Sequence, residues 1–168
     1  MARQAEPFRS FIDPDDRAFD QAGDLPNAVR DYCKRTDQPI PESVGEVMRC
    51  IYESLALRYR NAVDEIERCT GNQYHTIHIV GGGTKDQLLS AMTASACKRK
   101  VVSGPVEVTA IGNIAVQLIT LGAVDNLQEA RKIIAASSDL KIFEPKENKS
   151  WNDAAAAYQT ILSRSHLN

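Results

Sequence analysis

One uninterrupted helical pattern, from Ser43 to Gly71, constrains the fold of this chain more than any other part of its sequence. Ser43 and Glu46 form an S-x-x-E capping box, in which the serine hydroxyl accepts from a free amide and the glutamate reaches back. Gly71 supplies the left-handed residue that commonly ends a helix. Apolar residues recur between these ends with the three-and-four spacing of a buried helix face: Val44, Val47, Met48, Ile51, Leu55, Ala62, Val63 and Ile66. The sequence therefore predicts one long helix with a buried apolar stripe.

Two short strands and a glycine-rich loop follow this helix. Residues 74–80 form a β-branched run, which predicts a buried strand, and Gly81-Gly82-Gly83 ends it. A helix is expected over 85–97. A second short strand is predicted at 100–103, and Gly104-Pro105 ends that one.

Strands that alternate with helices indicate an α/β fold with parallel strand pairing. Four further helices are predicted, at residues 27–36, 108–121, 126–137 and 150–163. Asn126 and Ser150 are expected to cap the last two. Two strands are too few for a stable sheet, since three or more are normally needed. We therefore expect that part of the sheet is absent from this chain or comes from another chain.

No segment has the residue spacing of a metal site. His75 and His78 fall on opposite faces of the predicted strand, so they cannot share a metal ion. The acidic residues 13–16 lack the alternating spacing and the distal glutamate of a calcium loop, and a solvated turn is predicted there instead. We therefore predict no metal ligand within this chain.

The four cysteines, at positions 33, 50, 69 and 97, are widely spaced and form no CxxC pair or Cys/His cluster. Free, partly buried thiols are expected. A local disulfide between Cys33 and Cys50 is the alternative, although a cytosolic protein does not favour it.

Length and charge exclude several classes of protein. The chain has 168 residues, close to one ordinary domain. Its 20 basic and 22 acidic side chains give a net charge of -2, which argues against a general nucleic-acid binder. No apolar run approaches the ~20 residues of a membrane span, and no basic start is followed by an apolar signal core, so neither a membrane span nor a signal peptide is expected. The expected location is the cytoplasm.

The glycine triplet at 81–83 is the segment best suited to binding a ligand. Residues without side chains let a ligand touch the backbone, and the free amides of the following helix carry partial positive charge. These features suit an anion or a nucleotide. The triplet is neither a Walker loop nor a G-x-G-x-x-G fingerprint, and a tight turn without a ligand is the alternative.

The residues around the triplet favour a ligand-binding loop over a tight turn without a ligand. Residues 78–94 (HIVGGGTKDQLLSAMTA) and 101–117 (VVSGPVEVTAIGNIAVQ) together resemble the C-terminal part of the FGGY carbohydrate kinases. Residues 11–16, 38–43 and 53–60 resemble the same family, and most closely its members that act on rhamnulose. The combination of GGG, GPVE and GN at these spacings is far more specific than any single element, and the resemblance covers most of the chain.

The resemblance implies a ribonuclease-H-like (actin-like ATPase) fold, of which this chain would be part: few parallel strands flanked by helices. Residues 1–40 would be an approach segment with a short helix, and 41–168 the C-terminal portion of the nucleotide-binding domain. The implied reaction transfers the γ-phosphoryl group of ATP, with Mg²⁺, to a hydroxyl of a ketose. Gly81, Gly82, Gly83 and Asp86 would lie against the nucleotide.

The resemblance also implies what this chain lacks. The catalytic base of the family lies in an N-terminal domain that is absent here, so no catalytic residue is assigned and the isolated chain is expected to be inactive. An open sheet edge favours self-association. Alternatives are another kinase of the family, acting on xylulose, fuculose or glycerol, and a non-catalytic interaction module with the same fold.

Three departures from the family pattern accompany the resemblance. Asp86 stands where the family usually has Asn. Residues 91–96 read Ala-Met-Thr-Ala-Ser-Ala where relatives have Gln-Met-x-Ala-Asp-Ala, and the family's glycine near position 98 is replaced within Lys98-Arg99-Lys100.

Five other residues are expected to have structural roles. Glu107 and Thr109 are expected to cap the helix that begins near them, with an influence on the nucleotide loop as the alternative. Gly112 and Asn113 are expected to let that helix pack closely against the sheet. Trp151, the single tryptophan, is expected in the core or at a domain contact.

Overall fold

Helices and strands alternate along residues 1–20, 23–146 and 149–165, the parts of the chain that the computed structural model describes. Its helices are α1 (Leu25–Arg35), α2 (Val44–Thr70), α3 (Gln87–Cys97), α4 (Val108–Thr120), α5 (Leu127–Ser137) and α6 (Lys149–Ser165). Its strands are β1 (Thr76–Ile79), β2 (Lys100–Ser103) and β3 (Lys141–Phe143). Short 3-10 helices lie at η1 (Ala2–Gln4), η2 (Arg17–Phe19) and η3 (Gly81–Lys85).

The sheet has three strands in the order β1-β2-β3. β1 and β2 are parallel, as the sequence predicts, with α3 as the crossover between them. β3 was not predicted, and it pairs antiparallel with β2 through the register Val102↔Ile142. The chain therefore supplies the third strand itself, and the described sheet is mixed rather than purely parallel.

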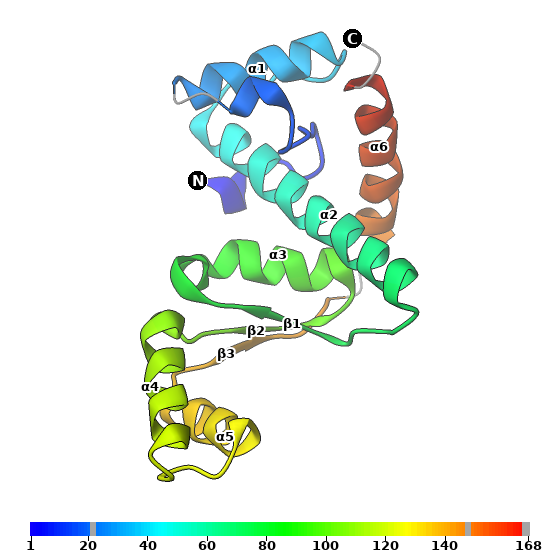
Figure 1. Cartoon of the computed structure of the whole chain (residues 1–168). Coiled ribbons are helices and arrows are strands. Elements are labelled where there is room, and N and C mark those ends of the chain that lie inside the picture. Colours follow the sequence, from blue (N-terminus) through cyan, green and yellow to red (C-terminus); the bar gives the residue numbers. More distant parts are fainter. Residues whose placement is uncertain (21–22, 147–148, 166–168) are drawn as a thin grey trace.

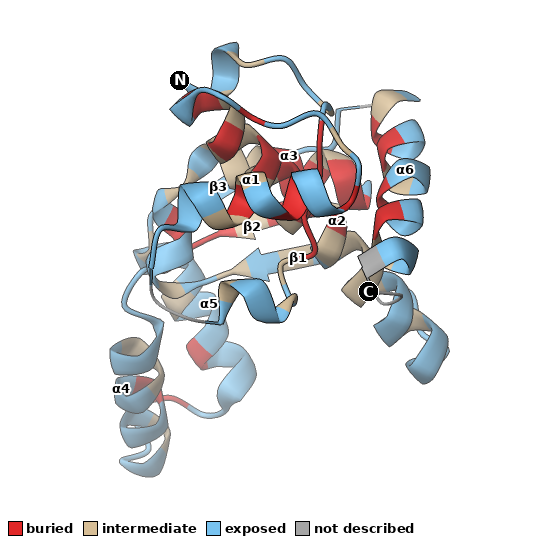
Figure 2. Ribbon diagram, turned by 90° about the horizontal axis from the view of Figure 1, so that it is seen from above, coloured by how far each residue is buried: buried red, intermediate tan, exposed pale blue. Residues whose placement is uncertain are grey.

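The helices lie unevenly about this sheet. In Figure 1, α3 lies between the sheet and α2, and α1 and α6 pack around α2 on the far side from the sheet. α4 and α5 lie away from these four helices, at one end of the sheet. Figure 2 shows the same division by burial, since buried positions concentrate on α1, α2, α3 and α6 while α4 and α5 are mostly exposed.

Two buried clusters hold the helical layer together. The first joins the N-terminal segment to α2, α3 and α6: Phe11, Ala56, Leu57, Met92, Ala96, Trp151, Ala154 and Tyr158. The second joins α1 to α2: Ile12, Val29, Tyr32, Cys33, Val47, Cys50 and Ile161. Trp151 is 5% exposed and stacks edge-on against Phe8 at 4.8 Å between ring centroids, which confirms its predicted core position.

The predictions for α2 hold at its ends but not for its buried face. The Ser43–Glu46 capping box is present in both directions, and Gly71 ends the helix at φ +69°. Of the predicted stripe only Val47 is buried, and Val44 is 64% exposed. The face that packs inward is instead formed by Gly45, Val47, Cys50, Glu53, Ser54, Ala56 and Leu57. Ile66, further along, is 50% exposed, because in Figure 1 this end of α2 projects beyond the helices that cover the rest.

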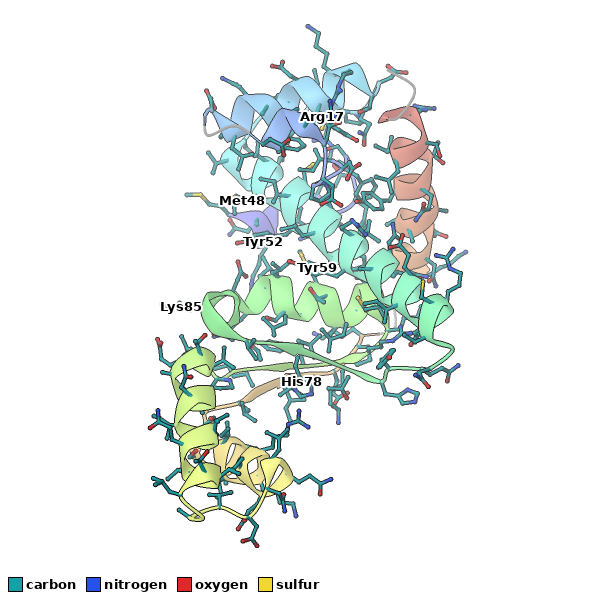
Figure 3. All side chains as sticks on the ribbon, viewed as in Figure 1. Arg17, Met48, Tyr52, Tyr59, His78 and Lys85 are labelled. Carbon is teal, nitrogen blue, oxygen red and sulfur yellow. The ribbon has the colours of Figure 1, made fainter. Side chains whose placement is uncertain are left out.

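The prediction that residues 74–80 form a buried strand is wrong in part. A strand forms at β1, but Thr76 and His78 are exposed and their neighbours are half-buried. β1 pairs on one side only, with β2, and Figure 3 shows His78 on the face of the sheet away from α3. Burial on both faces would need a second covering layer.

The predicted packing role of Gly112 and Asn113 is also wrong. A Cβ added at Gly112 would meet no heavy atom within 4 Å, so close packing does not require glycine there. Asn113 donates its side-chain amide to the Thr109 carbonyl oxygen, one turn back in α4, at 3.2 Å. Only Ala115 of α4 is buried, in a small cluster that α4 and α5 form by themselves.

The N-terminal segment and the cysteines agree with expectation. Residues 13–16 form a turn, closed by the Asp16 amide donating to the Asp13 carbonyl oxygen at 3.1 Å, although Asp13 itself is buried. All four cysteines are free, and of them only Cys69 is exposed. Within the described residues, no helix combines the length and apolar character that crossing a membrane requires.

Of the caps predicted for the last two helices, one forms as expected and one does not. Asn126 caps α5, since its Oδ1 accepts from the amides of Gln128 and Glu129 at 2.9 and 3.0 Å. Ser150 is not a cap, because α6 already includes it from Lys149 onward.

Candidate functional site

The glycine triplet forms a tight 3-10 turn, η3, between β1 and α3. Gly81 has φ +73°, a conformation that residues with a side chain rarely adopt, and this explains the need for glycine there. The Thr84 hydroxyl donates to the Gly81 carbonyl oxygen at 2.7 Å and closes the turn. The amide of Asp86 donates to the Gly83 carbonyl oxygen at 3.2 Å, which joins the turn to the helix that follows.

A second loop, between β2 and α4, holds this turn against the end of the sheet. The Gly104 amide donates to the Ile79 carbonyl oxygen at 2.9 Å, and the Gly81 amide donates to the Pro105 carbonyl oxygen at 3.1 Å. The two loops are therefore tied together by their backbones. These are the segments that carry the GGG and GPVE motifs of the sequence.

A cleft of about 380 Å³ opens beside the two loops. Its lining comes from η3, from the β2–α4 loop and from the α5–β3 connection: Thr84, Lys85, Ser103, Gly104, Pro105, Val106, Glu107, Ile111, Ser137, Ser138, Asp139 and Lys141. The volume lies within the range of small-molecule sites. Two lysines, two acidic residues (Glu107 and Asp139), hydroxyl groups and apolar atoms share its wall, so the lining has no excess of positive charge.

Gly82 leaves the backbone of the turn open. It is exposed, and a Cβ added to it would meet no heavy atom within 4 Å. The protein alone therefore does not require glycine at this position. The turn leaves room for a ligand to approach its backbone at Gly82.

Asp86 faces the other side of the turn. Its Oδ1 accepts from the Leu89 amide at 2.9 Å and so caps α3, and its Oδ2 accepts from the hydroxyl of Tyr52 on α2. Asp86 lines a separate hollow with Tyr52, Leu88 and residues 1–4, whereas Lys85 lines the cleft. The structure thus brings the glycines and the β2–α4 loop together, but it directs the Asp86 carboxylate toward α2.

The predicted capping role of Glu107 is wrong. Glu107 occupies the N-cap position of α4, but its side chain makes no capping hydrogen bond. It lines the cleft instead. Thr109, in the first turn of the same helix, is exposed and offers its carbonyl oxygen to Asn113.

Three parts of the site were not identified from the sequence. Lys85 lies two positions after the glycine triplet, and this closeness in sequence was the available signal. Residues 137–141 reach the cleft because β3 pairs with β2, and β3 was not predicted. Tyr52 gave no sequence signal, since it contacts Asp86 across 34 positions of the chain.

No group of three or more His, Cys, Asp or Glu residues in the described part of the chain is arranged to hold a metal ion. His75, just before β1, and His78, on β1, are both exposed.

Comparison with known proteins identifies the family to which this chain is similar. The model of the C-terminal domain of the FGGY family of carbohydrate kinases matches residues 1–121. The chain is 42% identical to the rhamnulokinase of Bacteroides thetaiotaomicron over 161 residues, and 40% identical to the rhamnulokinase of Lactiplantibacillus plantarum over 163. These alignments cover 96% and 97% of this chain but only 33% of each relative, so the chain spans about a third of their length.

Solved structures show the same fold at low sequence identity. The xylulose kinase from Rhodospirillum rubrum matches with a TM-score of 0.60 at 17% identity, over 76% of this chain and 26% of that one. The gluconate kinase from Lactobacillus acidophilus matches with a TM-score of 0.51 at 15% identity, over 77% and 26%. The α/β arrangement described above is therefore that of the actin-like C-terminal domain of such kinases, in the portion that this chain spans.

Proposed function

Because this chain belongs to the FGGY family of carbohydrate kinases, we propose that it serves as the C-terminal portion of an ATP-dependent sugar kinase. The substrate that we propose is the ketose rhamnulose, since the relatives at 42% and 40% identity are rhamnulokinases. In this proposal residues 1–40 are an approach segment and 41–168 belong to the nucleotide-binding domain. The expected place of action is the cytoplasm.

The observation that carries the proposal is the open glycine turn beside a cleft of about 380 Å³. We propose that the backbone of Gly81, Gly82 and Gly83 lies against the nucleotide. Glu107 and Asp139 line the cleft as well, so we propose that Lys85 and Lys141 attract the phosphate groups through direct contact rather than through an excess of positive charge. Asp86 belongs to this proposal through the turn that it anchors, because its carboxylate is engaged by Leu89 and Tyr52.

Bound ATP, accompanied by Mg²⁺, would supply the γ-phosphoryl group for a ketose hydroxyl. In phosphoryl transfer the protein contributes mainly positioning and charge stabilisation. The residues of this chain would bind and orient the nucleotide, and the sugar and the catalytic base would belong to the other kinase domain. We therefore propose that the isolated chain does not phosphorylate sugars.

A calorimetric titration of ATP into the purified chain tests the nucleotide site. We expect binding by the wild type and at least tenfold weaker binding by Gly82→Val, because a branched side chain blocks approach to the backbone. The melting temperature should stay unchanged, since the added Cβ has open space around it. Gly112→Ala, on α4, is the matched control and should bind ATP normally. Equal ATP affinity in both variants would contradict the nucleotide site.

A chimera tests the kinase assignment. The first two thirds of the Bacteroides thetaiotaomicron rhamnulokinase would be fused to this chain in place of its own C-terminal third. We expect ATP-dependent phosphorylation of rhamnulose that Gly82→Val abolishes, and no turnover by the isolated chain. A panel with xylulose, fuculose and glycerol examines the alternative substrates. A folded chimera that binds ATP but transfers no phosphoryl group would favour a non-catalytic interaction module.

A further inference from the structure

Tyr52 connects the long helix to the glycine turn. Its ring, half-buried on α2, packs with Leu88 against the first core cluster, and its hydroxyl donates to Oδ2 of Asp86. Figure 3 shows Tyr52 on α2 above the start of α3, near the turn that carries Lys85. Within the part of the chain that the structure describes, the Tyr52–Asp86 hydrogen bond is the only one that joins a side chain of α2 to the segment between β1 and α3.

Asp86 is the junction between η3 and α3. Its amide donates to the Gly83 carbonyl oxygen at 3.2 Å, so it closes the turn on one side. Its Oδ1 accepts from the Leu89 amide at 2.9 Å, and its carbonyl oxygen accepts from the Ser90 amide at 3.1 Å. Any change in the orientation of Asp86 therefore moves the end of the turn as well as the start of the helix.

The charge of Asp86 makes this orientation important. Glu107 and Asp139 already line the cleft, and an Asp86 carboxylate that faced it would give the lining an excess of negative charge. Such a charge would repel phosphate groups and would offset the partial positive charge at the start of α3. The hydroxyl of Tyr52 engages one carboxylate oxygen and the Leu89 amide engages the other, so the charge is directed toward α2. The hydrogen bond to Asp86 also raises the pKa of Tyr52 above its ordinary value, which is consistent with the phenol acting as the donor.

We propose that Tyr52 is a positioning residue for the nucleotide turn, which holds the Asp86 carboxylate away from the cleft and fixes η3 with Gly82 open to the ligand. The part that concerns the nucleotide rests on the proposed function. The part that concerns the turn does not, because it follows from the contacts within this chain.

The experiment compares Tyr52→Phe with Tyr59→Phe in the full 168-residue chain. Tyr59 lies on the same helix, is 40% exposed, and does not contact Asp86, so its variant controls for loss of a hydroxyl. We measure amide hydrogen exchange at Asp86 and Leu89 without nucleotide, and ATP affinity from the amide shifts of residues 81–85. Tyr52→Phe should speed exchange at both amides and weaken ATP binding by about threefold to tenfold. Tyr59→Phe should change neither.

A rescue variant separates charge from structure. In the Tyr52→Phe background, Asp86→Asn keeps an oxygen that can cap α3 but removes the negative charge. ATP affinity should return to the wild-type value or exceed it. A purely structural role of Tyr52 would not be rescued in this way.

The outcomes separate this inference from the proposed function. Normal ATP affinity of Tyr52→Phe, with or without faster exchange, would overturn the positioning role while leaving the nucleotide site intact. Unchanged exchange at Asp86 and Leu89 would overturn the coupling of Tyr52 to the turn. A wild-type chain that does not bind ATP would instead overturn the proposed function, and with it the nucleotide part of this inference.

Discussion

Arg49 and Glu53 form an ion pair one turn apart on α2, with 2.6 Å between Nε and Oε1, and the Glu53 side chain is only 1% exposed. The other carboxylate oxygen of Glu53 accepts from the Phe8 amide at 2.8 Å. Arg49 also donates to the carbonyl oxygen of Ala2 at 3.3 Å. This pair therefore binds the N-terminal segment to the longest helix. The segment includes Phe8 and its contact with Trp151.

Removing the arginine should destabilise the fold. Arg49→Leu leaves a buried carboxylate without its partner, and this type of change costs about 3 kcal/mol of unfolding free energy. Chemical denaturation of both proteins measures the difference. Arg9→Leu is the control, because Arg9 pairs with Glu46 at 3.0 Å on the surface, where such pairs contribute about 1 kcal/mol or less. Equal losses in the two variants would contradict a special role for Glu53.

The pH dependence of stability gives a second test of Glu53. Burial raises its pKa above the ordinary glutamate value of 4.5. The Glu53 carboxyl group of the folded chain therefore stays protonated to a higher pH than that of the unfolded chain. Its contribution to the free energy of unfolding is complete below pH 4.5 and is lost as the pH rises through the pKa of the folded state. Relative to Glu53→Gln, the wild type should lose unfolding free energy over that interval. A relative gain in stability with rising pH would mean that Arg49 outweighs burial.

Two glycines outside the turn should respond in opposite ways to alanine. Gly104 has φ +125°, and an added Cβ would lie 3.0 Å from Leu140 Cδ2 and 3.2 Å from the Asp139 carbonyl oxygen. Gly104→Ala should therefore cost about 2 kcal/mol or more. Gly112→Ala should stabilise the chain by about 0.5–1 kcal/mol, since α4 gains helix propensity and the Cβ has open space. Thermal unfolding measures both, and a loss at Gly112 would indicate that α4 is packed in solution.

Self-association is expected through the surface that α4 leaves open. This helix has no charged residue between Val108 and Thr120, and Ile114 and Val116 are 56% and 61% exposed. Exposed apolar patches of this kind favour association, and the unpaired edge of β1 adds backbone groups that can pair. Light scattering should show species larger than a monomer, and Ile114→Lys with Val116→Lys should reduce them. A monomeric wild type at high concentration would contradict this prediction.

The four thiols should react at different rates. Cys69 is exposed, whereas Cys33, Cys50 and Cys97 are buried, and burial raises the pKa of Cys97 to about 12. Because the thiolate is the reactive form, a thiol-specific reagent should modify one cysteine quickly in the folded chain and the other three only on unfolding. Fast reaction of Cys33 or Cys50 would indicate that the packing between α1 and α2 opens in solution, and fast reaction of Cys97 would indicate that α3 comes away from its neighbours.

Local chemistry explains why some elements could be predicted. Ser43 and Glu46 lie three residues apart, and the two hydrogen bonds of their capping box involve only neighbouring atoms. The same is true of Asn126 before α5 and of Gly71 after α2. The glycine triplet also determined a turn at 81–85, because the positive φ of Gly81 is a property of one residue.

Other features depended on residues far apart in the chain. β3 has three residues and no alternating pattern of its own, and it exists as a strand because Val102 pairs with Ile142. β1 has the composition of a buried strand, but two of its residues are exposed and two are half-buried, because exposure depends on which elements cover a strand and not on its composition. The orientation of Asp86 is set by Tyr52 on another helix. The sequence by itself therefore determined the capped helices and the glycine turn, because their energies come from atoms within about one turn of each other. Only the tertiary structure decided the burial of β1, the third strand and the side of the turn on which the Asp86 carboxylate lies. Those features depend on contacts that form when distant segments of the chain pack together.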